Sequence, residues 1–181
     1  MSDTSTPMEP AESVKVVVEI PKGSRNKYER NSATGEIELD RRLFASVSYP
    51  TEYGYVADTA AEDGDELDAL VAVTEPTFSG CVIHARPVAL LQMRDPDGAA
   101  DDKVFCVPLN DPAWETLHDV DDIPDDLRAE IVHFFKVYAD IRGTEPEVHG
   151  WASADEARTA IARARERLDS DSATREGRSA G

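Results

Sequence analysis

Apolar segments of strand length, separated by turn-forming residues, make up the first part of the chain. The segment from Val14 to Ile20 is rich in β-branched residues and is followed by Pro21-Lys22-Gly23, a pattern typical of a strand that ends in a turn. Tyr28 to Arg30 and Glu36 to Leu39 flank the turn-rich stretch of residues 31–35, and together they predict a hairpin.

Four further segments have the length and composition of strands: Gly54 to Ala57, Leu67 to Val73, Val82 to Met93 and Lys103 to Pro108. We expect the longest of them to bend at Pro87, because proline cannot donate a hydrogen bond inside a sheet. A barrel is the simplest arrangement of so many short strands, since closure leaves no unpaired edge.

Helical spacing appears only in the last third of the chain. After Pro124, apolar residues recur at helical intervals from Asp125 to Tyr138, and the first turn is acidic, as the helix dipole favours. The sequence Ser153-Ala154-Asp155-Glu156 has the pattern of a capping box and predicts a second helix that ends near Leu168. Strands followed by helices predict an α+β fold.

The chain is long enough for one domain. With 181 residues, of which 40% are hydrophobic, it can form one ordinary core but not two full domains. We expect residues 1–12 to be a flexible segment and residues 13–168 to form the domain. Residues 169–181 are polar and lack periodicity, so we expect them to be a disordered tail.

The net charge is strongly negative, with 37 acidic residues against 19 lysines and arginines. A charge of −18 would repel a nucleic-acid backbone, so we exclude that partner. Because the acid is spread along the chain, we predict a halophilic protein from a salt-rich cytoplasm, with an ordinary acidic protein as the alternative. No apolar run could span a bilayer and no secretory signal pattern is present, so we expect a cytoplasmic protein without a membrane partner.

A dense acidic segment lies between two apolar ones. Asp63, Asp65 and Asp68 fall within six residues, and Gly64 permits a tight turn. Because Asp68 begins an apolar strand, its carboxylate needs a partner, and a hard divalent cation can satisfy several carboxylates at once. In so acidic a chain a solvated turn is the alternative, and the spacing is not that of an EF-hand.

A second acidic segment, residues 95–102, also lies between two apolar strands. If both segments face one cavity, they could hold more than one Mg²⁺, an arrangement that stabilises the attacking and leaving oxygens of phosphoryl transfer. Basic residues are concentrated in the first quarter of the chain, and three of the five tyrosines lie between Tyr49 and Tyr55. Both residue types can bind phosphate oxygens, although pairing with surface acids is the alternative for the bases.

Five motifs follow one another along the chain: Glu19-Ile20-Pro21-Lys22-Gly23-Ser24-Arg25-Asn26-Lys27-Tyr28-Glu29, Asp40-Arg41, Tyr49-Pro50-x-x-Tyr53-Gly54-Tyr55, Asp63-Gly64-Asp65-x-x-Asp68 and Asp101-x-Lys103. In order and spacing they closely resemble the motifs of the soluble family I inorganic pyrophosphatases. Each motif alone is weak evidence, but five in register, from about Val14 to Trp151, are highly specific.

The resemblance implies a fold, an activity and partners. The fold would be a five-stranded OB-like β-barrel with flanking α-helices. The activity would be the Mg²⁺-dependent hydrolysis of inorganic pyrophosphate to two orthophosphates, with three to four Mg²⁺ ions in the site. The assembly would be a homo-oligomer, either a trimer or a hexamer, and we expect the hexamer.

The resemblance also implies roles, position by position. Asp65 would be the general base that takes a proton from a metal-bound water. The metal ligands would be Asp63, Asp68, Asp101, Glu19 and one aspartate of the second acidic segment, with Asp68 bridging two ions. The substrate-binding residues would be Lys27, Arg41, Tyr53 and Tyr138, with Glu29 and Tyr49 lining the site and Lys103 neutralising charge beside the metals.

Two departures from the family pattern concern the acidic segments. Glu66 stands where the family commonly has proline, which adds a charge beside the metals. The loop that leads to Asp101 is one residue longer than usual. We expect Asp95 to be the remaining metal ligand, with Asp97 as the alternative.

A third departure concerns phosphate binding. Ala139 directly follows Tyr138, at a position where the family has a phosphate-binding lysine. Losing one cationic contact costs about 1–3 kcal/mol unless another group replaces it, so we expect weaker substrate binding with the chemistry retained. Arg142 or Lys136 could compensate.

Two other functions compete with this interpretation. A non-catalytic acidic metal-binding protein on the same fold would be expected to lose central carboxylates, yet all of them are present. A phosphatase for organic phosphoesters or nucleotides has no support, because neither a P-loop nor a dinucleotide fingerprint occurs.

Overall fold

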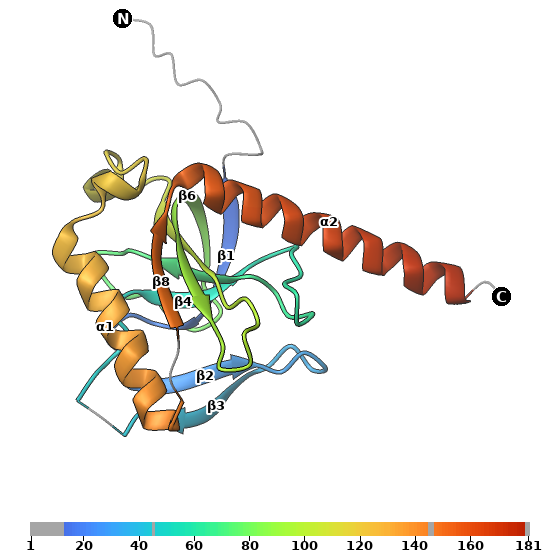
Figure 1. Ribbon diagram of the computed structural model, residues 1–181, viewed down its shortest axis with the longest axis horizontal. Helices are drawn as coiled ribbons and strands as arrows, with labels where there is room; N and C mark the ends of the chain where they lie inside the picture. Colours follow the sequence, from blue (N-terminus) through green and yellow to red (C-terminus); the bar gives the residue numbers. More distant parts are fainter. Residues whose placement is uncertain (1–12, 45, 145–146, 180–181) are drawn as a thin grey trace, which may run out of the picture.

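Five strands close into a barrel in the computed structural model, which describes residues 13–179 apart from residues 45, 145 and 146. The barrel strands are β1 (Val14–Ile20), β4 (Glu52–Val56), β5 (Asp68–Val71), β7 (Lys103–Pro108) and β6 (Val82–Arg94). They are hydrogen-bonded in that order, and the pairing of β6 with β1 closes the barrel (Figure 1). β5 and β7 are parallel, whereas the other barrel pairs are antiparallel.

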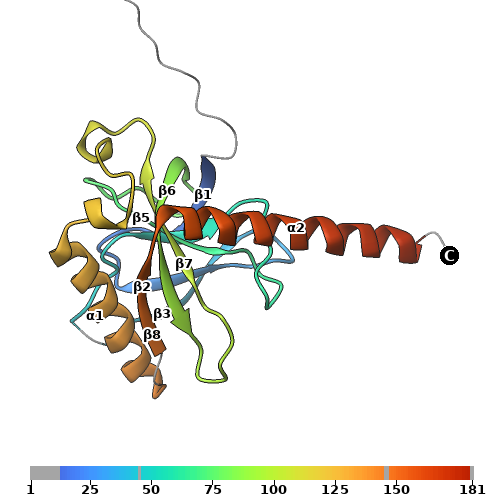
Figure 2. The same ribbon diagram turned by 45° about the horizontal axis from the view of Figure 1, so that its top comes forward.

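The remaining elements surround this barrel. They are the hairpin of β2 (Asn26–Arg30) and β3 (Ile37–Arg42), the strand β8 (Glu147–Ala152) beside β6, and the helices α1 (Asp125–Arg142) and α2 (Ala154–Ser179). Two 3-10 turns, Pro112–Trp114 and Val120–Asp122, lie between β7 and α1. α2 packs against β6 and then projects beyond the barrel (Figures 1 and 2). The predicted five-stranded barrel with flanking helices is confirmed.

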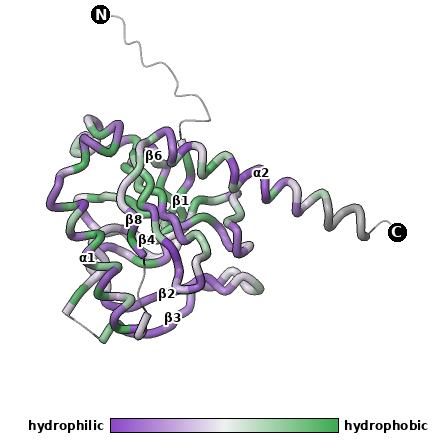
Figure 3. The backbone as a smooth tube through the Cα atoms, in the orientation of Figure 1, coloured by the Kyte–Doolittle hydropathy of each residue, from purple (hydrophilic) through white to green (hydrophobic). Residues whose placement is uncertain are grey.

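Alternating side chains along the strands supply two apolar clusters. In β7, Phe105 joins a buried cluster that includes Phe134 of α1. Val104 and Cys106, which point to the other side of the strand, join a cluster that includes Ile161 of α2. Each helix therefore covers one apolar cluster, and Figure 3 shows the hydrophobic positions concentrated in the barrel strands.

The predicted strands and helices are present, although some of their ends differ. Two larger differences are an additional strand, β8, and a longer α2. The register of β6 against β7 shifts between Pro87 and Ala89, as expected for proline in a paired strand. β8 was not predicted, because Gly150 and the charged residues around it interrupt any strand pattern. α2 extends to Ser179, so residues 169–179 are helical and not a disordered tail. Once the first turns are docked, extending a helix is far cheaper than starting one.

Residues 1–12 and 180–181, for which flexibility was expected, lie outside the described residues. Among the helices of the described part of the chain, none combines the length and apolar character needed to cross a bilayer.

Gly54 on β4 is paired with Val18 on β1. A Cβ atom at this position would lie 1.9 Å from the backbone oxygen of Val17. Because backbone cannot move aside as a flexible side chain can, we expect Gly54→Ala to lower the free energy of unfolding by about 3 kcal/mol, measured by urea denaturation.

Gly98→Ala is the matched control, because Gly98 has open space around it and only its φ of +86° opposes a side chain. In this control, the free energy of unfolding should fall by about 1 kcal/mol. Equal losses in the two variants would contradict the packing argument.

Candidate active site

A cavity of about 720 Å³ opens between the barrel, the β2–β3 hairpin and the two helices. All residues predicted for the site line it except Glu19: Lys27, Glu29, Arg41, Tyr49, Tyr53, Asp63, Asp65, Asp68, Asp95, Asp101, Lys103 and Tyr138. Residues up to 111 positions apart in sequence thus meet at one surface, with a carboxylate cluster around Lys103 in one part and with Lys27 and Arg41 of the β2–β3 hairpin in another.

Lys103 lies at the centre of the acidic side. Because β5 and β7 run parallel with Ala69 opposite Val104, their first residues, Asp68 and Lys103, lie side by side. The Nζ atom of Lys103 donates to Oδ2 of Asp68 at 2.7 Å and to Oδ1 of Asp101 at 2.8 Å. One buried ammonium group therefore holds two carboxylates in place.

These neighbours shift the proton affinities of the cluster. Burial lowers the pKa of Lys103, but the carboxylates of Asp68 and Asp101 outweigh it and hold the pKa above its ordinary value, so the ammonium stays charged. Burial raises the pKa of Asp101, with the charges of Asp68 and Asp95 adding to it and Lys103 opposing it. The site is therefore short of positive charge as it stands.

Tyr53 on β4 also contacts the cluster of Lys103, Asp68 and Asp101. Its hydroxyl donates to Oδ2 of Asp68 at 2.7 Å, the same oxygen that accepts from Lys103. Burial and the Asp68 charge raise the pKa of Tyr53 well above its usual value, so the phenol keeps its proton. No side chain of the described residues donates to the other oxygen of Asp68, which leaves it available to a cation.

Asp65 lies in a tight loop before β5. The loop is closed by hydrogen bonds from the backbone nitrogen of Ala61 to the oxygen of Asp65, at 2.6 Å, and from the nitrogen of Asp65 to Oδ1 of Asp63, at 3.0 Å. Gly64 permits this turn with a φ of +91°. Among the described residues, no group donates a hydrogen bond to the Asp65 carboxylate.

The environment of Asp65 favours proton uptake. Desolvation raises its pKa above the ordinary value, and the negative charges of Asp63, Glu66 and Asp68 act in the same direction, against a smaller effect of Arg30. A carboxylate with a raised pKa and a free oxygen facing a cavity has the properties of a general base.

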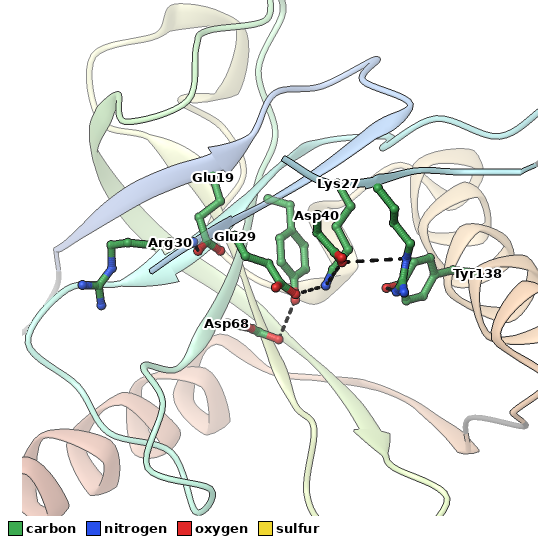
Figure 4. Close-up of polar contacts among 9 residues, drawn as sticks. Glu19, Lys27, Glu29, Arg30, Asp40, Asp68 and Tyr138 are labelled. Carbon is green, nitrogen blue, oxygen red and sulfur yellow. Dashed lines mark hydrogen bonds and ion pairs between the residues drawn. The ribbon is translucent and has the colours of Figure 1, made fainter. Parts of the chain in front are cut away.

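Glu19 lies behind this cluster and does not line the cavity. Its Oε1 accepts a hydrogen bond of 2.9 Å from the backbone nitrogen of Arg30. Burial raises its pKa, partly offset by this bond, and the Asp68 charge raises it further. Figure 4 shows Glu19 on the side of the site toward Arg30, away from Tyr138.

The basic side of the cavity is built on the β2–β3 hairpin. Lys27 and Arg41 are paired across the two strands, and Lys27 contacts Glu29 and, at 3.1 Å, Asp40 (Figure 4). Burial lowers the pKa of Lys27, but these acids raise it more. Nη2 of Arg41 donates to the hydroxyl of Tyr138 on α1 at 2.9 Å, a contact that raises the pKa of Arg41.

Comparison with known proteins decides the family. A family model described as inorganic pyrophosphatase matches residues 16–169. The chain belongs to this family. It is 50% identical over 154 residues to the inorganic pyrophosphatase of Streptomyces coelicolor, covering 84% of this chain and 94% of that protein. It is 51% identical over 142 residues to that of Methanosarcina acetivorans, covering 78% and 84% of the two chains.

Solved structures of the same family have the same fold. The crystal structure of inorganic pyrophosphatase from Thermus thermophilus superimposes with a TM-score of 0.84 at 37% identity, covering 90% of this chain and 94% of that one. The structure from Helicobacter pylori also gives a TM-score of 0.84, at 33% identity, with coverage of 88% and 95%.

The residues at which this chain departs from the pyrophosphatase pattern differ in whether they line the cavity. Asp95 lines the cavity, whereas Asp97 is exposed outside it and accepts a hydrogen bond of 3.0 Å from the nitrogen of Ala99 in its own loop. Ala139 is a buried part of the lining. Arg142 lies one helical turn beyond Tyr138, lines the cavity and stacks over that ring at 5.8 Å, while Lys136 does not line it.

Some cavity residues of this pyrophosphatase were not predicted for the site. Asp40 pairs with Lys27, and its pKa is lowered by that hydrogen bond. Arg163 and Arg167 line the cavity from α2. Their spacing of four residues is a local signal of a shared helix face, but only the docking of α2 shows what that face meets.

Proposed function

We propose that this pyrophosphatase family member hydrolyses inorganic pyrophosphate to two orthophosphates in the cytoplasm, with Mg²⁺ as the metal. The observation that supports this most is the division of one cavity into a carboxylate cluster around Lys103 and a basic cluster around Lys27 and Arg41. The first suits hard cations and the second suits a polyanion. Close relatives named inorganic pyrophosphatase support the same substrate.

The donor set suits Mg²⁺, and three to four ions are what we propose. Carboxylates are the ligands that this ion prefers, and the raised pKa values of Asp65 and Asp101 indicate crowding of negative charge that cations would relieve. Within the described residues, no three acidic, histidine or cysteine side chains converge closely enough to enclose an ion alone. Mg²⁺ usually takes only one or two carboxylates together with waters and substrate phosphates.

We assign the metal ligands as Asp63, Asp68, Asp95 and Asp101, with Glu19 as a supporting carboxylate. When bound, Mg²⁺ would neutralise phosphate charge and acidify a water molecule. Lys103 has the complementary task of keeping Asp68 and Asp101 oriented and ionised. Tyr53 fixes the same oxygen of Asp68, so the ligand is oriented from two sides.

Asp65 would take a proton from the water that attacks one phosphorus atom, while the bond from that phosphorus to the bridging oxygen breaks. Lys27, Arg41 and Tyr138 would hold the phosphates in line with this attack, and Arg41 is already oriented by its bond to Tyr138. Glu29 and Tyr49 complete the lining.

A phosphate-release assay tests the proposed function. Purified protein is given pyrophosphate, and separately an organic phosphomonoester, each with Mg²⁺ and with excess chelator. We expect release from pyrophosphate that requires Mg²⁺ and no comparable release from the phosphomonoester. Metal binding without phosphate release would favour the non-catalytic alternative, and equal rates on both substrates would favour a general phosphatase.

Arg142 is proposed to replace the phosphate contact that Ala139 lacks. Because its guanidinium reaches the cavity beside Tyr138, we expect Arg142→Ala to raise KM for magnesium pyrophosphate about tenfold, with kcat little changed. Steady-state kinetics measure both constants. Lys136→Ala, on the same helix but outside the cavity, is the control and should leave KM unchanged; an equal rise in both variants would contradict the assignment.

We propose that the strongly acidic surface is an adaptation to high salt. With a net charge of −18, self-repulsion opposes folding until salt screens it, so the free energy of unfolding should rise with KCl concentration. Urea denaturation across a KCl series measures the effect. Full stability at low salt would contradict this proposal.

A hexamer is the assembly we propose. Large apolar side chains are exposed on the described surface, notably Phe44 at 86% and Phe78 at 66% of their area, and such groups are commonly covered by association. Light scattering after size-exclusion chromatography distinguishes the hexamer from a trimer or a monomer.

A further inference from the structure

We propose that Arg30 and Glu66 form a positioning pair, which holds the loop of Asp65 against strand β2. The guanidinium Nη2 of Arg30 contacts Oε1 of Glu66, the residue that directly follows Asp65. The two side chains are only 24% and 32% exposed, so their ion pair is partly shielded from water and salt. The proposal rests on the proposed function, because it concerns the placement of the proposed base.

Arg30 is itself held in place by two further contacts. Its guanidinium lies over the ring of Tyr55, 4.9 Å from the centroid. Its backbone nitrogen donates to Oε1 of Glu19 at 2.9 Å. Since Tyr55 and Glu19 belong to barrel strands, Arg30 connects the rigid barrel to the loop. A side chain anchored in this way can fix the position of Glu66.

Backbone bonds hold the two ends of the loop: Ala60 donates to the oxygen of Ala164 on α2 at 2.9 Å, and the oxygen of Leu67 accepts from Val56 of β4 at 2.8 Å. Between these ends, the backbone bonds of the loop are internal. The bonds that join Ala61, Asp63 and Asp65 close the turn on itself and do not attach it to the barrel. A second contact comes from α2, where Arg167 lies 3.5 Å from Glu62. Between its two anchored ends, the loop is thus attached by side chains from the β2 side through Glu66 and from the α2 side through Glu62.

Asp65 depends on this attachment for its position. No described group donates a hydrogen bond to its carboxylate, so the position of the loop backbone sets where this side chain starts and no neighbour holds it further. A displacement of about 1 Å in a catalytic group can lower a rate about 100-fold. Arg30 also offsets the charge of Glu66, which directly follows Asp65 in an acidic loop.

The test uses Glu66→Gln, Arg30→Gln and the double variant in the full chain. We expect each single variant to lower kcat about tenfold with KM little changed, and the double variant to lose no more than either single one, since each single change removes one charge of the same ion pair. Asp155→Asn, which breaks the exposed Arg158–Asp155 pair on α2, is the control and should leave kcat unchanged.

Hydrogen exchange of the metal-free protein supplies a readout that does not depend on activity. We expect amides of residues 61–66 to exchange faster in Glu66→Gln than in the wild type, while the barrel strands are unchanged. Unchanged exchange in this loop, or a wild-type kcat in the single variants, would overturn the proposal. If the wild type fails to hydrolyse pyrophosphate but the loop exchange rises, the proposed function fails and the positioning pair stands.

Discussion

Replacing Asp65 by asparagine is expected to lower kcat for pyrophosphate hydrolysis by a factor of about 10² to 10⁴, the usual contribution of a general base. Asparagine has nearly the same shape but cannot take a proton. The carboxylate of Asp65 accepts no hydrogen bond from the described residues, so its replacement breaks no structural contact. The fold should therefore be unaffected, and the loss should appear in kcat more than in KM.

The control for this prediction is Asp97→Asn, the same chemical change in an exposed loop outside the cavity. The side-chain oxygen that accepts from Ala99 is retained in asparagine, so activity should be that of the wild type. Steady-state phosphate release measures both variants, and denaturation checks that both are folded. A wild-type kcat in Asp65→Asn would remove Asp65 as the base, and an equal loss in both variants would show that the effect is not specific.

Replacing Lys103 by methionine is expected to lower the free energy of unfolding of the metal-free protein by about 3 kcal/mol. The variant removes the shared partner of Asp68 and Asp101 and leaves their negative charges facing each other in a poorly solvated place. We choose the lower end of the usual cost of breaking a buried ion pair, because both carboxylates keep about a third of their exposure.

The loss of stability in Lys103→Met should depend on pH. The pKa of Asp101 is already raised by burial and by neighbouring carboxylates, so its charged form opposes folding at neutral pH. As the pH falls through this raised pKa, the folded state takes up a proton and no longer needs the ammonium group. The loss in Lys103→Met should therefore be largest at neutral pH and shrink in mild acid.

Urea denaturation in chelator at neutral and mildly acidic pH measures the difference. Lys15→Met is the matched control, since Lys15 is exposed on β1, and it should cost little at either pH. A loss in Lys103→Met that is the same at both pH values would mean that carboxylate repulsion is not the cause.

Local patterns predicted most of the fold, because strand and helix periods are properties of short segments. Val14 to Ile20 and Lys103 to Pro108 were predicted with the bounds that the structure has. The strand Glu147–Ala152 was not, because it is stabilised by pairing with β6 and not by its own composition. The end of α2 was also missed, because polar residues beyond the barrel have no apolar period to detect.

The sequence by itself predicted most of the chemical groups that line the cavity and the order in which they occur. Aspartates, bases and tyrosines recur in motifs that are short enough to recognise without any structure. Only the tertiary structure decided their partners. Lys103 meets Asp68 across 35 positions because β5 and β7 are parallel, and Arg30 meets Glu66 across 36 because the loop lies against β2.

The same distinction applies to the positions that sequence left open. Asp95 and Asp97 are equivalent in composition, and the turn alone places the first in the cavity lining and leaves the second outside. Arg142 and Lys136 are both cations on α1, but only Arg142 lies on the helix face that carries Tyr138 and lines the cavity. Such contacts depend on packing between distant elements, which no short segment of sequence encodes.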